Sequence, residues 1–110
     1  MSLLTNETKH LIGVLADCAA VCEACAKDCA SRGDADLAAC VSLCSDCATL
    51  CLACIPLLAR GSGLSADQCR TCAEACQRCA DECERTGMTD CAQACRAAAA
   101  ACRQMADSAT

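Results

Sequence analysis

Cysteine is the chemically reactive residue that stands out in this sequence, both by its number and by its spacing. It occurs 17 times in 110 residues, in runs such as CAAVCEACAKDC, where consecutive cysteines lie three or four positions apart. Because an α-helix has about 3.6 residues per turn, this spacing places the thiols of one run on a single helix face. Thiols at this density are ligands for soft metal ions. The sequence predicts that each helix carries a stripe of metal-binding thiols, and these are Cys18, Cys22, Cys25, Cys29, Cys40, Cys44, Cys47, Cys51, Cys54, Cys69, Cys72, Cys76, Cys79, Cys83, Cys91, Cys95 and Cys102.

The cysteine content of about 15 % exceeds the roughly 8–10 % that is typical of a disulfide scaffold. However, the first residues lack the features of a secretory signal, and no stretch approaches the roughly 20 apolar residues of a membrane span. The cysteine count is odd, and neighbouring cysteines on one helix have nearly parallel Cβ vectors, which suits a disulfide poorly. We expect a cytoplasmic protein with reduced thiols and no membrane association, with cross-helix disulfides as an alternative on oxidation.

Three short breaks divide the chain into four segments that are rich in helix-forming residues. They predict helices over about 6–31, 35–59, 66–86 and 90–107. Gly33 and Gly87 are the expected stop residues, Asp34 and Thr89 the expected N-caps, and Ser65 with Gln68 the expected capping box. Pro56 should kink or end the second helix near its C-terminus. Short connections favour antiparallel neighbours. We therefore expect one all-α domain over residues 1–110, an antiparallel up-down-up-down four-helix bundle with a cysteine-lined core.

Cysteine would replace the leucine and isoleucine that normally fill such a core. A leucine at each site would stabilise the bundle by on the order of 1 kcal/mol more, so this many cysteines indicate a role for sulfur chemistry rather than for packing alone. One end of the bundle carries apolar side chains that can plug it: Leu4, Leu11, Leu15, Ile55 and Leu58. The other end carries Met88 and three carboxylates, Asp34, Asp36 and Asp90, near the outer thiols.

Among soft ions, Cu(I) fits the spacing best. It accepts two or three thiolates, and side chains four positions apart on a helix have Cβ atoms roughly 5–6 Å apart, which two metal–sulfur bonds of about 2.3 Å can span. Seven CxxxC pairs have this spacing: 18/22, 25/29, 40/44, 47/51, 72/76, 79/83 and 91/95. Because buried uncompensated thiolates are costly, the core should fill toward about one ion per cysteine, which indicates storage rather than transfer.

Two other functions are also consistent with these residues. One is zinc or mixed-metal detoxification by thiolates, and the other is a thiol redox protein. The second is less favoured because no cysteine has an obvious basic partner, so we do not expect an enzyme. We expect copper to enter at the end of the bundle that carries Met88. There Met88 is either a soft relay ligand or an apolar contact before the helix that follows. We expect the only histidine, His10, to lie on the surface and Met105 to be a packing residue.

The remaining surface suggests partners. The net charge of −5 and the absence of aromatic residues argue against nucleic acid. Helix 35–59 carries few charges and has Leu43, Leu50 and Leu57 seven residues apart beside its thiol stripe, which predicts a homo-oligomer through this helix. Helix 66–86 instead carries opposite charges four residues apart, in the pairs 70/74, 74/78 and 81/85, which indicates a solvated face.

These stripes resemble the bacterial copper storage proteins, above all in the run from Cys69 to Cys83 and the segment from Cys91 to Arg96. The resemblance extends from about residue 10 to residue 105. It implies Cu(I) held by thiolates within each bundle, a homotetramer, and the cytosolic branch of the family. The chain departs from the family in having Ala98 at a stripe position and in lacking histidines in the turn at 84–90.

Overall fold

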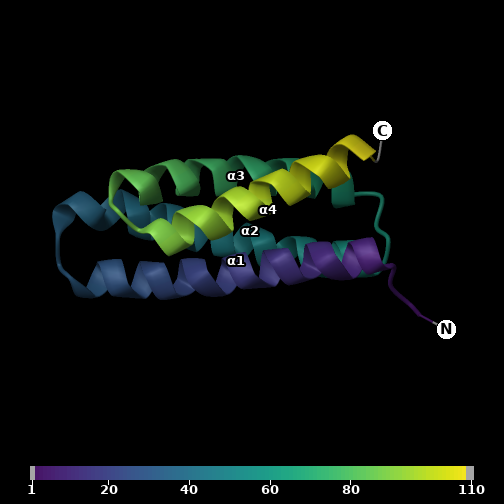
Figure 1. Ribbon diagram of the computed structural model, residues 1–110, viewed down its shortest axis with the longest axis horizontal. Coiled ribbons are helices and arrows are strands. Elements are labelled where there is room, and N and C mark those ends of the chain that lie inside the picture. The colour runs from purple at the N-terminus through teal and green to yellow at the C-terminus, as the bar shows by residue number, and fades with distance from the viewer. Residues whose placement is uncertain (1, 109–110) are drawn as a thin grey trace.

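The computed structural model describes residues 2–108, which form four α-helices and one short 3₁₀-helix. α1 spans Asn6–Ser31, η1 Ala35–Leu37, α2 Ala38–Ala59, α3 Ser65–Arg85 and α4 Thr89–Ser108. Successive α-helices run in opposite directions, so the α1–α2 and α3–α4 connections lie at one end of the molecule and the α2–α3 connection at the other (Figure 1). The antiparallel four-helix bundle is confirmed, and the predicted helix limits differ from the observed ones by at most three residues.

Local sequence rules account for the starts of α1 and η1 and for the turns after α1 and α3. The Thr5 hydroxyl accepts a hydrogen bond from the Thr8 amide at the start of α1, and the Asp34 carboxylate accepts one from the Asp36 amide at the start of η1. Gly33 and Gly87 have φ angles of 65° and 79°, a left-handed conformation that other residues rarely adopt. These glycines therefore allow the chain to turn directly after α1 and α3.

The start of α3 differs from expectation. The predicted capping box of Ser65 and Gln68 is wrong: Ser65 is already the first helical residue, and Leu64 occupies the cap position without a side-chain hydrogen bond. The hydroxyl that supports this turn belongs to Ser62, which accepts from the Leu64 amide at 3.1 Å. Pro56 lies inside α2, and the helix ends three residues later at Ala59, the predicted limit.

The helices pack in a cycle around one core, with α1 and α3 each lying between α2 and α4. The body measures 49 × 25 × 18 Å. Small side chains let the helices approach closely, because the buried residues are almost all cysteine and alanine. Leu11, Leu15 and Leu58 are buried and Ile55 packs against the core. Four of the five predicted plug residues therefore close the end of the bundle where α1 begins and α2 ends, which we call the Leu15 end. Leu4 stays partly exposed and lies outside this core.

α2 is the most apolar helix. Within Ala35–Ala59, an 18-residue window reaches a mean hydropathy of 1.9, so this segment could cross a membrane by length and composition alone. Its five cysteines face the core of the bundle, and a core helix of a soluble protein gives the same signal. Only a third of that window is buried, which leaves apolar side chains on its outer face.

Candidate metal centre

All 17 cysteines are free thiols, and all four helices direct them toward the bundle axis. Sixteen of them are at most 2 % exposed, and Cys25 alone is half-buried. The spacing of three and four residues produces this result, because it keeps every thiol of a helix on the face that meets the other helices. Ala98 is also fully buried on α4, at the position where its stripe lacks a sulfur.

The sulfurs form a continuous row along the axis. Five groups can be distinguished in which all Sγ atoms lie within 4.8 Å of one another. From the end that carries Met88 inward, the groups are Cys25/Cys29/Cys40, Cys25/Cys44/Cys83/Cys91, Cys22/Cys44/Cys79/Cys91, Cys18/Cys22/Cys47/Cys95 and Cys18/Cys47/Cys51/Cys76. Consecutive groups share at least one cysteine, so an ion bound in one group can share a bridging thiolate with an ion in the next.

The predicted CxxxC pairs are present, but they are not the closest contacts. Six of the seven pairs have Sγ–Sγ distances of 3.9–4.0 Å, and the seventh, Cys47 with Cys51, belongs to one of the groups. Sulfurs on different helices come closer, at 3.4 Å for Cys47 and Cys76. With metal–sulfur bonds of about 2.3 Å, three-coordinate geometry needs sulfurs about 4.0 Å apart and linear geometry about 4.6 Å. The present spacing therefore suits three or four ligands, and linear binding would require the two sulfurs to move slightly apart.

A last cluster lies toward the Leu15 end. Cys72 continues the row, with its Sγ 3.6 Å from that of Cys51. Beyond it, contacts among the four thiols of Cys54, Cys69, Cys72 and Cys102 shift one another's pKa: the contact with Cys102 lowers that of Cys69, and the contact with Cys54 raises that of Cys102. α1 adds no sulfur here, because Leu15 occupies its stripe position.

Contacts between the core thiols raise the pKa of some and lower the pKa of others. Burial raises the pKa of Cys25 and that of Cys29. Deeper in the row, contact with Cys22 lowers the pKa of Cys18, whereas contact with Cys18 raises the pKa of Cys22. A thiolate is thus stabilised only beside a neighbour that keeps its proton. A metal ion that enters this row must displace protons, and its own charge must replace theirs.

The sulfur row reaches the surface at the Met88 end. A surface hollow there is lined by Val21, Ala24, Gly87 and Thr89 together with Cys25, Met88, Asp90 and Cys91. Two of the three predicted carboxylates are engaged elsewhere, since Asp34 caps η1 and Asp36 pairs with Arg85. Only Asp90 of the three lines the hollow.

The other two candidates fall outside the metal-binding row. His10 is exposed and belongs to no potential metal group among the described residues. Met105 is half-buried and packs against the core, as expected.

Comparison with known proteins agrees with this geometry. The family model for the copper storage protein matches residues 4–107, nearly the whole chain. The chain belongs to the copper storage protein family. The crystal structure of the Nmul_A1745 protein from Nitrosospira multiformis is similar, with a TM-score of 0.84 and 30 % identity over 92 % of this chain and 95 % of that one. No curated protein matches the sequence. Family membership and the clustered cysteines fit a copper storage role, which is a role in binding rather than catalysis.

Because sixteen thiols are buried and Cys25 lines a hollow, a thiol reagent should modify Cys25 first in the reduced, metal-free protein. We expect a fast phase of one thiol per chain, resolved by mass spectrometry, followed by slow modification of the rest. Cys25→Ser should remove the fast phase, whereas Cys22→Ser, a buried control on the same helix, should leave it. Early modification of several cysteines at one rate would contradict the structure.

Proposed function

We propose that this chain is a cytosolic Cu(I) store, with residues 1–110 as one storage domain and many ions held by the core cysteines. The observation that carries this proposal is the unbroken row of sulfur groups, each within 4.8 Å, running through an interior that offers almost no other donor. The ligands we propose are the 17 cysteines, with Met88 as a soft contact at the entrance. Free thiols throughout are consistent with a reducing compartment.

Charge favours Cu(I) as the cargo. A Cu(I) ion that replaces one thiol proton leaves the buried core neutral, whereas Zn(II) held by four thiolates leaves two negative charges in it. Shared cysteines between consecutive groups also suit bridging thiolates, which bring the ratio of ions to sulfurs toward one. Both arguments support a large number of monovalent ions.

Zinc detoxification remains a second candidate because four of the groups contain four sulfurs, the number that structural zinc sites use. These groups overlap, however. At most two of them can be filled without sharing a cysteine, for example Cys18/Cys47/Cys51/Cys76 and Cys22/Cys44/Cys79/Cys91. With the four-thiol cluster at the Leu15 end added, zinc should saturate near three ions per chain. A thiol redox function has less support, since only Cys25 is accessible.

Titration of the reduced protein with Cu(I) against a strong competing chelator separates these functions. We expect on the order of ten or more tightly held Cu(I) ions per chain, approaching one per cysteine, because each ion exchanges for a proton. A parallel zinc titration should end near three. Saturation of Cu(I) at one or two ions, or displacement of bound Cu(I) by zinc, would overturn the storage proposal.

We place copper uptake at the hollow beside Cys25. Met88 packs against the core and lines this hollow together with Cys25 and Cys91, so its thioether can hand an ion to either thiolate. Asp90, on the same rim, attracts cations. The competing interpretation, that Met88 only packs before α4, predicts no kinetic role.

Met88→Leu keeps the apolar volume and removes the sulfur. We expect uptake of Cu(I) from a weak donor to slow severalfold, followed by stopped-flow absorbance, while the final number of bound ions stays unchanged. Met105→Leu is the matched control, because Met105 lies at the Leu15 end and should leave the rate unaffected. Equal rates for the two variants and the wild type would remove Met88 from the uptake route.

We also infer that the chain forms a homo-oligomer, a tetramer, through α2. Leu43, Leu50 and Leu57 are only half-buried, Leu52 is 52 % exposed, and a second surface hollow between α2 and α3 is lined by Leu43 and Leu50. The charged rim of this hollow, with Asp46 on one side and Arg78 on the other, suits a second copy of the same face.

Light scattering at micromolar concentration should give a mass of about four chains for the wild type, consistent with an apolar patch of this kind. The double variant Leu43→Glu/Leu50→Glu should shift the protein to the monomer without changing the copper bound per chain, because both side chains line the surface hollow and neither is a proposed ligand. A monomeric wild type would end this inference.

A further inference from the structure

The thiol stripe of α3 continues at both ends as a hydroxyl. Ser65 stands four residues before Cys69, and Thr86 stands three residues after Cys83, so both occupy the register of the stripe. Ser65 is only 5 % exposed, and its Oγ is the one buried side-chain polar atom in the described residues without a hydrogen-bond partner. An orphaned buried hydroxyl is costly and calls for an explanation.

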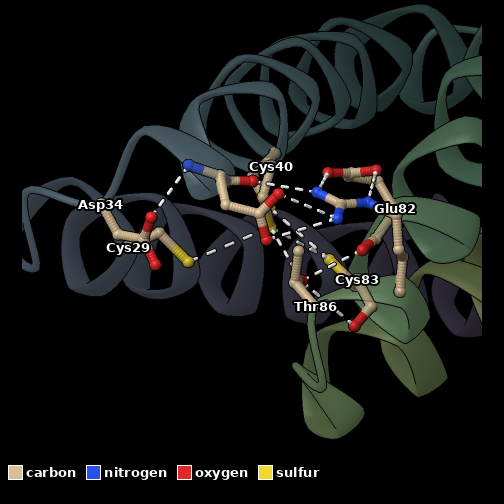
Figure 2. Close-up of polar contacts among 9 residues, drawn as sticks. Cys29, Asp34, Cys40, Glu82, Cys83 and Thr86 are labelled. Carbon is tan, nitrogen blue, oxygen red and sulfur yellow. Dashed lines mark hydrogen bonds and ion pairs between the residues drawn. The ribbon is translucent and has the colours of Figure 1, made fainter.

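Thr86 already contacts the sulfur row. Its hydroxyl oxygen lies 3.7 Å from the Sγ of Cys40, beside Cys83 (Figure 2). It is the only side-chain oxygen or nitrogen in the described residues with a hydrogen-bond contact to a cysteine sulfur. The same hydroxyl also lies 3.0 Å from the Glu82 carbonyl and 3.3 Å from the Cys83 carbonyl. Since it has a single hydrogen, its bond to sulfur competes with bonds to the backbone.

The position of Thr86 against α2 is held by its neighbour. Arg85 donates to the Asp36 backbone carbonyl at 2.9 Å and to the Asp36 carboxylate at 3.2 Å, and it pairs with Glu82 at 2.7 Å. These bonds tie the end of α3 to the 3₁₀ turn that leads into Cys40. The distance from the Thr86 hydroxyl to the sulfur therefore depends on contacts outside the sulfur row.

The two ends of a filled sulfur row differ electrostatically from its middle. A thiolate in the middle can bridge two ions, whereas a thiolate at an end has ions on one side only and keeps more of its negative charge. Cys40 belongs to the outermost group at the Met88 end, and Cys69 begins the α3 stripe at the Leu15 end. A hydrogen bond to a charged acceptor is about twice as strong as one between neutral groups. The end thiolates are thus the ones that gain most from a donor.

We propose that Thr86 and Ser65 are hydrogen-bond donors to the end thiolates of the copper-loaded row, Thr86 to Cys40 and Ser65 to Cys69. This inference rests on the proposed function. In the empty protein the Thr86 hydroxyl is shared with backbone carbonyls and the Ser65 hydroxyl has no partner. On loading, each turns to a charged sulfur. Cysteines four residues apart on these helices have sulfurs 3.9–4.0 Å apart, so a side-chain rotation of Ser65 can bring its oxygen within reach of Cys69.

The test is retention of Cu(I) by loaded protein along a series of chelator concentrations. In Thr86→Val and in Ser65→Ala we expect the one or two weakest-held ions to be lost at roughly tenfold lower chelator concentration, the loss typical of a hydrogen bond to a charged group, with the rest unchanged. Thr71→Val is the control for Thr86, because Thr71 makes the same bond to the carbonyl four residues back but faces solvent. Ser45→Ala is the control for Ser65, since Ser45 bonds only to the Val41 carbonyl.

A second readout separates this role from a structural one. Because Ser65→Ala removes an unpartnered buried hydroxyl, the metal-free protein should be as stable as the wild type or more stable in urea unfolding, while copper retention falls. Lower stability of the metal-free variant together with unchanged retention would overturn the proposal. So would retention equal to the wild type in both variants, the same loss in the controls, or a loss at one end only.

The wild type separates failure of the hydroxyl assignment from failure of the storage function. A wild type that binds many Cu(I) ions, with variants that retain them equally well, refutes the hydroxyl assignment and leaves the storage function intact. A wild type that binds only one or two Cu(I) ions refutes both.

Discussion

Contact between thiols along the bundle axis is the interaction on which the rest of this structure depends. Sixteen cysteines are almost fully buried and no aromatic side chain contributes to the interior, so sulfur fills the space that leucine fills in other bundles. Each thiol buries less apolar surface than leucine would, and stability must come from close approach of the helices. The same close approach brings sulfurs from different helices to within 3.4–4.0 Å, the range in which they can share a metal ion.

The two ends of the bundle are chemically distinct, although the middle is nearly uniform. At the Leu15 end, Leu11, Leu15 and Leu58 replace cysteine at or beside the stripe positions, and the row of sulfurs stops within the protein. At the Met88 end the row reaches a surface hollow through Cys25, while the ion pairs of Arg85 close the neighbouring side over Cys40. The asymmetry arises from a few residues outside the repeat, not from the repeat itself.

Much of the fold could be predicted from the sequence because its dominant signal is local and periodic. Gly33 and Gly87 marked real helix ends, and the spacing of cysteines correctly placed every thiol toward the interior. The prediction of a capping box at Ser65 is wrong because a serine three residues before a glutamine is also consistent with a first helical residue, which Ser65 is. Local rules also failed for charges: Arg78 pairs with Glu74 as expected, but Arg70 pairs with Asp67 and Asp81 pairs with Arg96 of another helix.

The way in which sulfurs from different helices group together could not be predicted from the sequence. Spacing identifies neighbours on one helix, but the heights at which four helices face one another depend on their packing. The shortest contact, between Cys47 and Cys76, therefore has no signature in the sequence. The contact of Thr86 with Cys40 is also long-range, and only its place in the α3 stripe could have indicated it.

The hollow lined by Cys25 lies at one end of the sulfur row, and buried leucines cover the other end. If ions exchange through that hollow, the row behaves as a stack, in which the ion that arrived first lies deepest and departs last. Exchange with the surroundings then concerns mainly the outermost positions, and the deep positions turn over only when those in front of them are vacated.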